Sequence, residues 1–440
     1  MQMAACWSKF RVSTRIQNLG CFVAVILVAF LLLSDGLVDM VEAITHAGDI
    51  QALKQVLMAV NAASIKPSSC LGSWNFSMDP CDARSSAHFT CGIDCSPATI
   101  NGERYITGLQ LERGAGYQGI LSPHIGRLAA LQRLILSGNS FHGHIPASLA
   151  NLKELVQLDL SVNSFSGSIP ESLGLLQNIE FFSVAYNLLD GQIPKSFSNL
   201  TSIICMYLNN NQLSGNMPEF LELKQLKYLD ASDNRLSGPL PAQLPPMLRL
   251  LSLGKNHLTG DLPLSLKSLR FLHVLDLRSN LLTGVLESFI FELPSLQQLN
   301  LADNQFTSLG TTNASSIRSN LLTLDLSFNI LQGSLPESIA GFRKLNVLSL
   351  QSNLFSGPIP HNLALKVGNL LPGTEQLRHL HLEDNYLTGD IPLPFFHLST
   401  DTNSAHLGMN CLWSCPTSFF FCQGEAQRSA TECQARNIPM

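Results

Sequence analysis

The sequence has few charged residues and lacks the short motifs that mark common enzymes. Only 13% of its 440 residues are Asp, Glu, Lys or Arg, about half the usual share for a soluble globular chain. This low share argues against intrinsic disorder and against a coiled coil, because both need charge-rich segments. The sequence has no Walker loop, HExxH helix, GxSxG elbow or spaced metal-ligand cluster. We therefore expect no enzyme, no cofactor and no resident metal.

A surplus of basic residues is missing as well. The chain has 27 Lys and Arg against 32 Asp and Glu, which gives a net charge of −5. Binding to a phosphate backbone needs basic residues that neutralise it. We therefore do not expect a nucleic acid as a partner.

The longest unbroken apolar run is Cys21–Leu33, which follows three basic residues and no acidic residue. Its length suits a secretory signal and falls short of the roughly 20 residues that span a membrane. Val41-Glu42-Ala43 has small residues at the cleavage spacing, so we predict a signal peptide over residues 1–43; cleavage near Ser34-Asp35-Gly36 is a rival. A buried core helix or an uncleaved anchor are the structural alternatives. Cleavage would leave a secreted protein with no further membrane span.

The eleven cysteines are unevenly distributed. Two lie in the predicted signal, one is Cys205, and the other eight form two clusters: Cys70, Cys81, Cys91 and Cys95, then Cys411, Cys415, Cys422 and Cys433. Two clusters of four cysteines each fit two disulfide-stapled caps in an oxidising compartment. Zinc sites are the alternative, but paired CxxC knuckles are missing. Each cluster allows three connectivities, and the spacing does not choose between them.

An asparagine recurs between the two clusters, and the apolar residues that precede it recur with it. Its copies are Asn139, Asn163, Asn187, Asn211, Asn234, Asn256, Asn280, Asn304, Asn329, Asn353 and Asn385. Apolar residues stand eight, five and three positions before each copy, as in Leu155-x-x-Leu158-x-Leu160-x-x-Asn163. This is the pattern of leucine-rich repeats. Residues 106–128 form a degenerate further copy that lacks the asparagine.

The spacing predicts one short strand in each repeat. Side chains alternate along a strand, so the residues five and three before the asparagine share one face. Stacked repeats would pair these strands into a parallel sheet and bury the leucines in one continuous core. The asparagine amide would satisfy backbone groups where the chain leaves the strand.

A second signature follows the asparagine. Glycine stands four residues after it in ten of the eleven copies, and proline seven residues after it in nine. Glycine permits a turn, and proline removes a donor and blocks a continuing helix. We therefore expect the returning segment to be extended or 3₁₀-helical.

The combined pattern LxxLxxLxLxxNxLxGxIP resembles the plant-type extracellular leucine-rich repeat of receptor-like kinases, receptor-like proteins and polygalacturonase-inhibiting proteins. Residues 49–54, Ser73-Trp74, Asp79-Pro80-Cys81 and Phe89-Thr90-Cys91-Gly92 resemble the amino-terminal cap of this family. The resemblance implies an α/β repeat solenoid, that is, a right-handed superhelix with a parallel sheet on its concave face and disulfide-stapled caps. It also implies a recognition role, and by analogy the pairs Cys81–Cys91 and Cys70–Cys95.

The domain organisation follows from these boundaries. We predict a signal peptide (1–43), a cysteine-containing cap (44–105), about twelve repeats (106–400) and a second cysteine-containing cap (401–440). No kinase signature follows the repeats in the sequence. About eight extra residues around His361–Thr374 are too short for the island subdomain of some receptors of the family.

The other face of the strands is where we expect a partner to bind. Residues six, four and two positions before each asparagine point to this face. Phe181, Cys205, Tyr207 and Tyr228 should form one patch there, because neighbouring strands lie about 4.8 Å apart. We predict that a partner contacts Phe181, Tyr207, Tyr228, Arg278, His379 and His381. Exposed aromatics suit this role, and partial burial without a ligand is the equally weighted alternative.

Three further features on this face have a more ordinary interpretation. Asp159, Asp230, Asp276 and Asp325 recur four positions before their asparagines; they could attract a cationic partner, but surface solubility explains them as well. His379, His381 and Glu383 alternate on the last predicted strand, yet three ligands on a flat sheet indicate a metal only weakly. Cys205 is expected to be a passive, partly buried residue.

Three sequons, at Asn75, Asn199 and Asn313, predict glycosylation of a secreted chain. They lie outside the strand positions described above, so the sheet face would stay accessible.

Two functions fit these features. The first is a receptor-like protein in the extracellular space (apoplast), secreted or associated with the cell surface, that binds a peptide or protein; signalling would then need a membrane co-receptor. The second is a secreted inhibitor of cell-wall-degrading enzymes, similar to the polygalacturonase-inhibiting proteins. A glycan or pectin binder is a further alternative.

Overall fold

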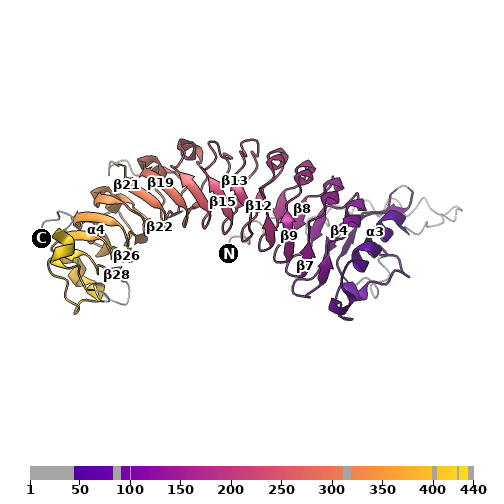
Figure 1. Ribbon diagram of the computed structural model, residues 1–440, viewed down its shortest axis with the longest axis horizontal. Helices are drawn as coiled ribbons and strands as arrows, with labels where there is room; N and C mark the ends of the chain where they lie inside the picture. The colour runs from indigo at the N-terminus through magenta and orange to yellow at the C-terminus, as the bar shows by residue number, and fades with distance from the viewer. Residues whose placement is uncertain are drawn as a thin grey trace, which may run out of the picture.

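The computed structural model is an arch built from stacked repeats (Figure 1). It describes residues 44–82, 91–99, 101–310, 319–398, 404–423 and 426–434. The predicted signal peptide and the sequon at Asn313 lie outside these ranges. Among the described residues, no helix is both long and apolar enough to cross a lipid bilayer.

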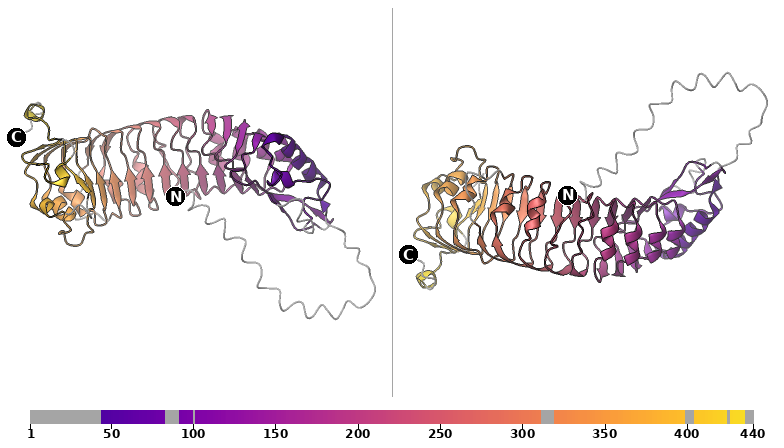
Figure 2. Two further views of the ribbon diagram at one scale, coloured as in Figure 1. Left: turned by 90° about the horizontal axis from the view of Figure 1, so that it is seen from below. Right: turned by 90° about the horizontal axis from the view of Figure 1, so that it is seen from above.

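A 14-stranded sheet runs along the whole arch, and its strands lie side by side in the view from below (Figure 2, left). Its strands are β2 (Ile93–Cys95), β4 (Ile106–Gln110), β6 (Arg133–Ile135), β8 (Gln157–Asp159), β10 (Phe181–Ser183), β12 (Cys205–Tyr207), β14 (Tyr228–Asp230), β16 (Leu250–Ser252), β18 (Val274–Asp276), β20 (Gln298–Asn300), β22 (Thr323–Asp325), β24 (Val347–Ser349), β26 (His379–His381) and β28 (Ser404–His406). From β4 onward the strands are parallel, and β2 pairs antiparallel with β4. The sheet predicted from the repeat spacing is thereby confirmed.

A second row of strands lies on the outer side of the repeats and is split into three sheets. The first sheet holds β5 (Gln118–Ile120), β7 (Ser140–Gly143), β9 (Ser164–Ser168) and β11 (Leu188–Asp190); the second holds β13 (Ser214–Asn216), β15 (Arg235–Gly238), β17 (His257–Gly260), β19 (Leu281–Leu286) and β21 (Gln305–Leu309); the third holds β23 (Gln332–Ser334), β25 (Leu354–Pro358), β27 (Tyr386–Gly389) and β29 (Cys411–Leu412).

Most returning segments are 3₁₀-helical, as the proline positions predict. The 3₁₀ turns of the repeats are η4 (Pro123–Arg127), η5 (Ala147–Asn151), η6 (Glu171–Leu175), η7 (Lys195–Asn199), η8 (Leu264–Ser268), η9 (Ser288–Glu292), η11 (Glu337–Gly341) and η12 (Leu393–His397). Between η7 and η8 the described chain forms no helical turn, and the view from above shows this gap in the row (Figure 2, right).

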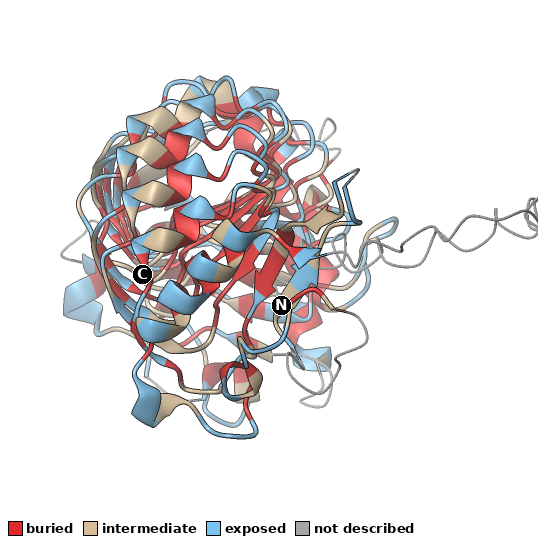
Figure 3. Ribbon diagram, turned by 90° about the vertical axis from the view of Figure 1, so that its right-hand side faces the viewer, coloured by how far each residue is buried: buried red, intermediate tan, exposed pale blue. Residues whose placement is uncertain are grey.

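The leucines of the pattern form one continuous core between the two rows. Leu158, Leu229 and Leu348 are completely buried, and one cluster of buried apolar residues extends from α3 (Ala47–Met58) to η13 (Phe420–Cys422). In the end-on view the buried positions line the interior of the solenoid (Figure 3). Because each repeat shares its core with its neighbours, the chain is one cooperative stack.

The asparagines connect neighbouring repeats through side-chain hydrogen bonds. The Asn256 Nδ2 donates to the carbonyl oxygens of Leu253 (3.0 Å) and, in the preceding repeat, of Ala231 (3.1 Å). Its Oδ1 accepts from the backbone N–H of Leu236 (2.9 Å), also in the preceding repeat. The same pattern continues at Asn410, which the sequence analysis missed although Ala405-x-Leu407-x-x-Asn410 carries its signal. The repeat architecture therefore continues past residue 400.

The residue before each asparagine has a left-handed backbone. From the second asparagine onward it is a non-glycine residue with φ between 51° and 57°, including Val162 (55°), Asp303 (55°) and Phe328 (53°). This conformation turns the chain out of the inner strand. It is unfavourable for L-residues, and most of all for a β-branched residue such as Val162.

The disulfides of the amino-terminal cap differ from the pairs that the family resemblance implied. The observed pairs are Cys70–Cys91 and Cys81–Cys95, so Cys81–Cys91 and Cys70–Cys95 were wrong. The reason lies in the packing of the cap on the first strands. The Cys70 N–H donates to the Glu112 carboxylate (2.7 Å), which follows β4 beside Gly92, and the Cys81 carbonyl accepts from Arg104 (2.7 Å).

The remaining cap elements close the two ends of the core. β1 (Ile44–Thr45) pairs with β3 (Glu103–Arg104), and η2 (Ala62–Ser64) and η3 (Leu71–Ser73) follow α3. At the other end, Cys411 pairs with Cys433, in α5 (Ala430–Gln434), and Cys415 pairs with Cys422. This nested arrangement is one of the three connectivities that the spacing left open.

We predict that Asn256→Ala or Asn211→Ala lowers the free energy of unfolding by about 1–3 kcal/mol, because carbonyl and amide groups of two repeats lose their partner. Chemical denaturation measures the loss. Asn178→Ala is the control, since the Asn178 amide reaches one carbonyl on the exposed surface, and we expect a change below about 0.5 kcal/mol. Wild-type stability of Asn256→Ala would contradict the role of the ladder.

We predict that Val162→Asn raises the free energy of unfolding by about 1 kcal/mol, because asparagine tolerates the left-handed conformation better than valine does. The exposed Asp303 has the same backbone geometry, so Asp303→Val should lower stability by a similar amount. Parallel denaturation curves of the two variants test both signs. Equal midpoints would show that this backbone conformation carries no cost here.

Candidate functional site

The inner face, defined as the concave side of the 14-stranded sheet, brings the predicted aromatic residues together. Register pairs Phe181 with Cys205 and Cys205 with Tyr228 on neighbouring strands. The Phe181 and Tyr207 rings lie 5.8 Å apart, and these residues form a buried cluster separate from the main core, with Tyr228 packed against it. The predicted juxtaposition is present.

The exposure of this cluster differs from the prediction. Phe181, Cys205 and Tyr207 have exposed fractions of 1%, 0% and 1%, so they are not the exposed anchors that we expected. Tyr228 alone of the four is half-buried. The Phe181 and Tyr207 rings pack against each other, and Cys205 is disulfide-bonded, not the passive unpaired cysteine that we expected. The sequence pattern shows the face on which a residue lies but not how much of it remains in solvent.

Three polar atoms beside this cluster are buried and have no hydrogen-bond partner in the described part of the chain. They are the Tyr207 hydroxyl, the Ser183 hydroxyl and the Asn209 Oδ1. Burial, with smaller effects of Asp230 and Tyr228, raises the pKa of Tyr207 well above its usual value. The phenol is therefore neutral at physiological pH. It can donate or accept a hydrogen bond.

The aspartates of the inner face tie the turn that follows each strand. The Asp159 Oδ1 accepts from the Ser161 N–H (3.0 Å) and from the Ser161 hydroxyl (2.6 Å). Asp230 and Asp325 make the same pair of bonds to the serine two residues on. Burial raises the pKa of Asp159 and Asp230, and the serine bonds oppose this shift. The Asp-x-Ser pattern is visible in the sequence. The hydrogen bonds to serine give these carboxylates a structural role.

Arg278 and Asp276 form a more open pair near the middle of the inner face. The Arg278 Nε lies 3.6 Å from the Asp276 Oδ2, and about half of the arginine side chain is exposed (48%). Such an ion pair contributes little to stability. The guanidinium keeps donors available for another molecule.

The predicted histidines lie at the carboxy-terminal end of the inner face. His379 is exposed, and His381 is half-buried with its Nδ1 3.3 Å from the Glu383 Oε1. The hydrogen bond to Glu383 raises the pKa of His381, and burial opposes it. The sequence analysis missed His406 on β28, whose ring stacks on His381 at 5.0 Å. His406 lies in the region predicted to be the second cap, so the sequence analysis did not assign it to a strand.

The extra residues around His361–Thr374 form the short helix α4 (His361–Val367) and the turn after it. Lys366, in its last turn, is completely buried, and its Nζ donates to the carbonyl oxygens of Glu375 (2.9 Å) and Arg343 (3.4 Å). Burial lowers the pKa of Lys366 to about 8, although Glu375 acts in the opposite direction. The insertion is thus anchored by a lysine that interacts with backbone carbonyls.

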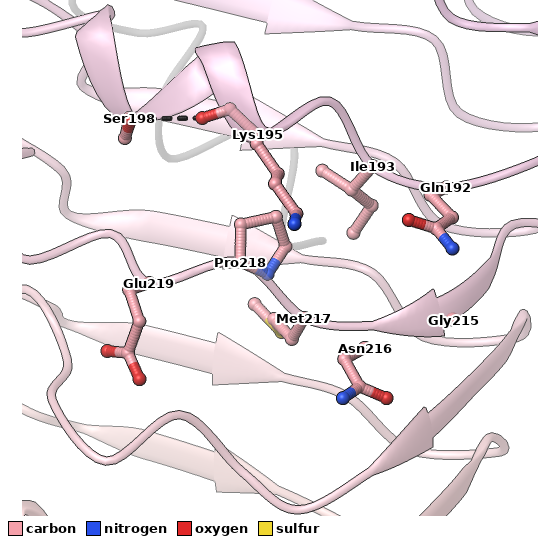
Figure 4. Close-up of a pocket in the computed structure, with 9 residues that line it drawn as sticks. All are labelled: Gln192, Ile193, Lys195, Ser198, Gly215, Asn216, Met217, Pro218 and Glu219. Atoms are coloured by element: carbon pink, nitrogen blue, oxygen red, sulfur yellow. Dashed lines mark hydrogen bonds between the residues drawn. The ribbon is translucent and has the colours of Figure 1, made fainter.

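The outer side has a hollow where its second row of strands breaks between β11 and β13 (Figure 4). Its volume is about 630 Å³, and Ile193 and Met217 contribute apolar atoms to it. Lys195 and Glu219 extend from opposite sides of this hollow (Figure 4). The Glu219 carboxylate accepts the N–H groups of Ala242 (3.2 Å) and Gln243 (3.3 Å), so it holds the next repeat.

Two of the three sequons can be placed. Asn75 and Asn199 are exposed, in the cap and at the end of η7. Neither lies on the strands of the inner face, so a glycan at either position would start away from that face. Glycosylation itself stays a prediction.

Comparison with known proteins supports the repeat assignment. Family models described as leucine rich repeat match residues 130–152, 154–176, 225–247, 294–355 and 376–398. Receptor-like protein 35 of Arabidopsis thaliana is 35% identical over 173 residues, which cover 38% of this chain and 17% of that protein. Receptor-like protein 39 of the same plant is 32% identical over 209 residues, 43% of this chain and 24% of that protein.

A solved structure agrees with these matches. The plant peptide hormone receptor RGFR1, in complex with RGF2, has a TM-score of 0.62 and 31% identity, covering 67% of this chain and 46% of that chain. The chain therefore matches only a part of these longer proteins: less than a quarter of the two receptor-like proteins and less than half of the solved receptor chain.

We predict that Lys366 makes stability depend on pH. Its pKa is about 8 in the folded chain against a usual 10.5, so the unfolded chain binds more protons between these values and stability rises with pH. Relative to Lys366→Met, the wild type should gain about 2 kcal/mol from pH 7 to pH 10. Denaturation of both proteins across this range measures the difference. A constant difference would contradict a lowered pKa.

Proposed function

We propose that this chain, a leucine-rich-repeat protein similar to plant receptor-like proteins, is an extracellular recognition module that binds a peptide or protein through the inner face of its sheet. The observation that carries this proposal is the inner face itself. It is one sheet of 14 strands in continuous register, on the concave side of the arch. Such a face can follow an extended partner over many repeats.

Four of the six residues predicted from the sequence are accessible to a partner, and the buried pair Phe181 and Tyr207 supports the face beneath them. The Phe181 and Tyr207 rings are buried and pack against each other. The half-buried ring of Tyr228 lies beside them. Arg278 offers an exposed guanidinium in the middle of the face, and His379 and His381 lie towards its end. Aromatic and arginine side chains of this kind dominate binding energies at interfaces.

The location and the mode of action belong to the proposal as well. Four disulfides join described cysteines, which suits an oxidising, extracellular compartment. Outside the cell the chain would act by binding rather than by catalysis. Signal transmission would then need a membrane co-receptor.

The test is affinity capture from the extracellular fluid of plant tissue, with the purified chain as bait. The triple variant Tyr228→Asn, Arg278→Ala, His379→Ala should recover at least tenfold less of the captured partner than the wild type, because it removes three solvent-accessible contacts spread along the inner face. Tyr186→Asn is the matched control: Tyr186 is an exposed aromatic residue next to the ladder asparagine, outside the inner strands.

Two outcomes would contradict the proposal. Undiminished capture by the triple variant would exclude the inner face as the binding surface. A captured cell-wall hydrolase, inhibited by the chain, would instead support the inhibitor function. Circular dichroism of each variant establishes that the fold is kept.

A further inference from the structure

We propose that His379, His381 and His406, on the inner face of the last two strands, form a zinc-binding site. The register of the sheet places these three imidazoles together. His381 on β26 is paired with His406 on β28, and His379 is paired with Ser404, so all three side chains lie on one face of adjacent strands. Two histidines separated by one residue, with a third on the neighbouring strand, supply the three imidazole ligands of a catalytic-type zinc site.

Two of these rings have a polar neighbour at one ring nitrogen, which leaves the other nitrogen for a metal. The Glu383 Oε1 lies 3.3 Å from the His381 Nδ1. With the proton on Nδ1, the His381 Nε2 keeps its lone pair for a cation. The Ser404 hydroxyl lies 3.0 Å from the His406 Nε2, which leaves the His406 Nδ1 for the metal in the same way. Metal-binding histidines use their second nitrogen in this manner.

The charge around the three rings favours a cation. Glu383 and Asp325 are the charged groups that act on His381, and both are acidic. The second carboxylate oxygen of Glu383 is buried and has no hydrogen-bond partner among the described residues. In the same part of the chain, no lysine or arginine forms an ion pair with Glu383 or Asp325. These two carboxylates would therefore attract a divalent cation to this end of the inner face.

Binding requires rotation of the side chains, because the nitrogens of the three rings do not converge as the rings stand. The rings of His381 and His406 are stacked, with an angle of 10° between their planes, and His379 and His406 are exposed. Rotation of exposed side chains costs little, and Zn–N bonds are about 2.0–2.1 Å long. Among the described residues, the one group of three potential ligands whose atoms already lie close together is elsewhere, at Cys70, Cys91 and Glu112. Its two sulfurs form a disulfide.

The experiment titrates the full chain, with its disulfides intact, with Zn²⁺ alone at neutral pH in a calorimeter. We expect one zinc ion per chain. His381→Gln and His406→Gln should each weaken binding at least tenfold, and the double variant should remove it. Co²⁺ provides a second measurement, because a tetrahedral site gives intense visible absorption bands that the double variant should lose.

The matched control is the double variant His142→Gln, His144→Gln. These histidines are separated by one residue and are exposed like His379 and His406. His142 lies in β7 and His144 directly follows it, and β7 pairs with Gln118–Ile120 and with Ser164 and Phe165, which supply no third imidazole. We expect wild-type zinc affinity for this variant. Zinc binding that persists in the His381→Gln, His406→Gln variant would overturn the proposal, and so would the absence of any binding heat when wild-type chain is titrated with excess zinc. Partner capture is measured in a separate experiment with a metal chelator present, so failure of the zinc site and failure of the proposed function are distinguishable.

Discussion

The buried asparagine at the end of each inner strand is the interaction on which the repeats depend. A strand of three residues that turns sharply leaves carbonyl and amide groups pointing into the core, where an unpaired group costs about 1–3 kcal/mol. The asparagine supplies two donors and an acceptor at that point. Since its bonds reach the preceding repeat as well as its own, each repeat is completed only by its neighbour. The stack is therefore the smallest stable unit.

This constraint shapes the rest of the repeat. The chain must turn sharply just before the asparagine, which places even Val162 in the left-handed conformation. It must then return on the outer side, where the 3₁₀ turns and short strands vary from repeat to repeat without disturbing the ladder. The break between β11 and β13 and the helix α4 are both variations of this outer segment. The inner sheet passes both of them without interruption.

The inner face shows the same division between structure and recognition. Asp159, Asp230 and Asp325 accept hydrogen bonds from the serines two residues on, which explains their recurrence without a ligand. Its aromatic pair packs against itself. The side chains that remain available, such as Arg278 and His379, differ from one repeat to the next. A face of this kind has a uniform frame and a varied set of contacts, which suits recognition of one particular partner.

The sequence by itself determined the repeat, the parallel sheet, the burial of the leucines and the outer 3₁₀ turns. All of these follow from periodicity, since a pattern of about 24 residues repeated in register has one way to bury its apolar face. Only the tertiary structure decided the disulfide pairs of the first cap, the burial of Phe181 and Tyr207, and the pairing of His381 with His406. Each of these depends on distances between segments that do not share the repeat, or on how closely side chains of adjacent strands pack. Periodicity assigns a face to each residue, but neighbours in space set its exposure and its partners.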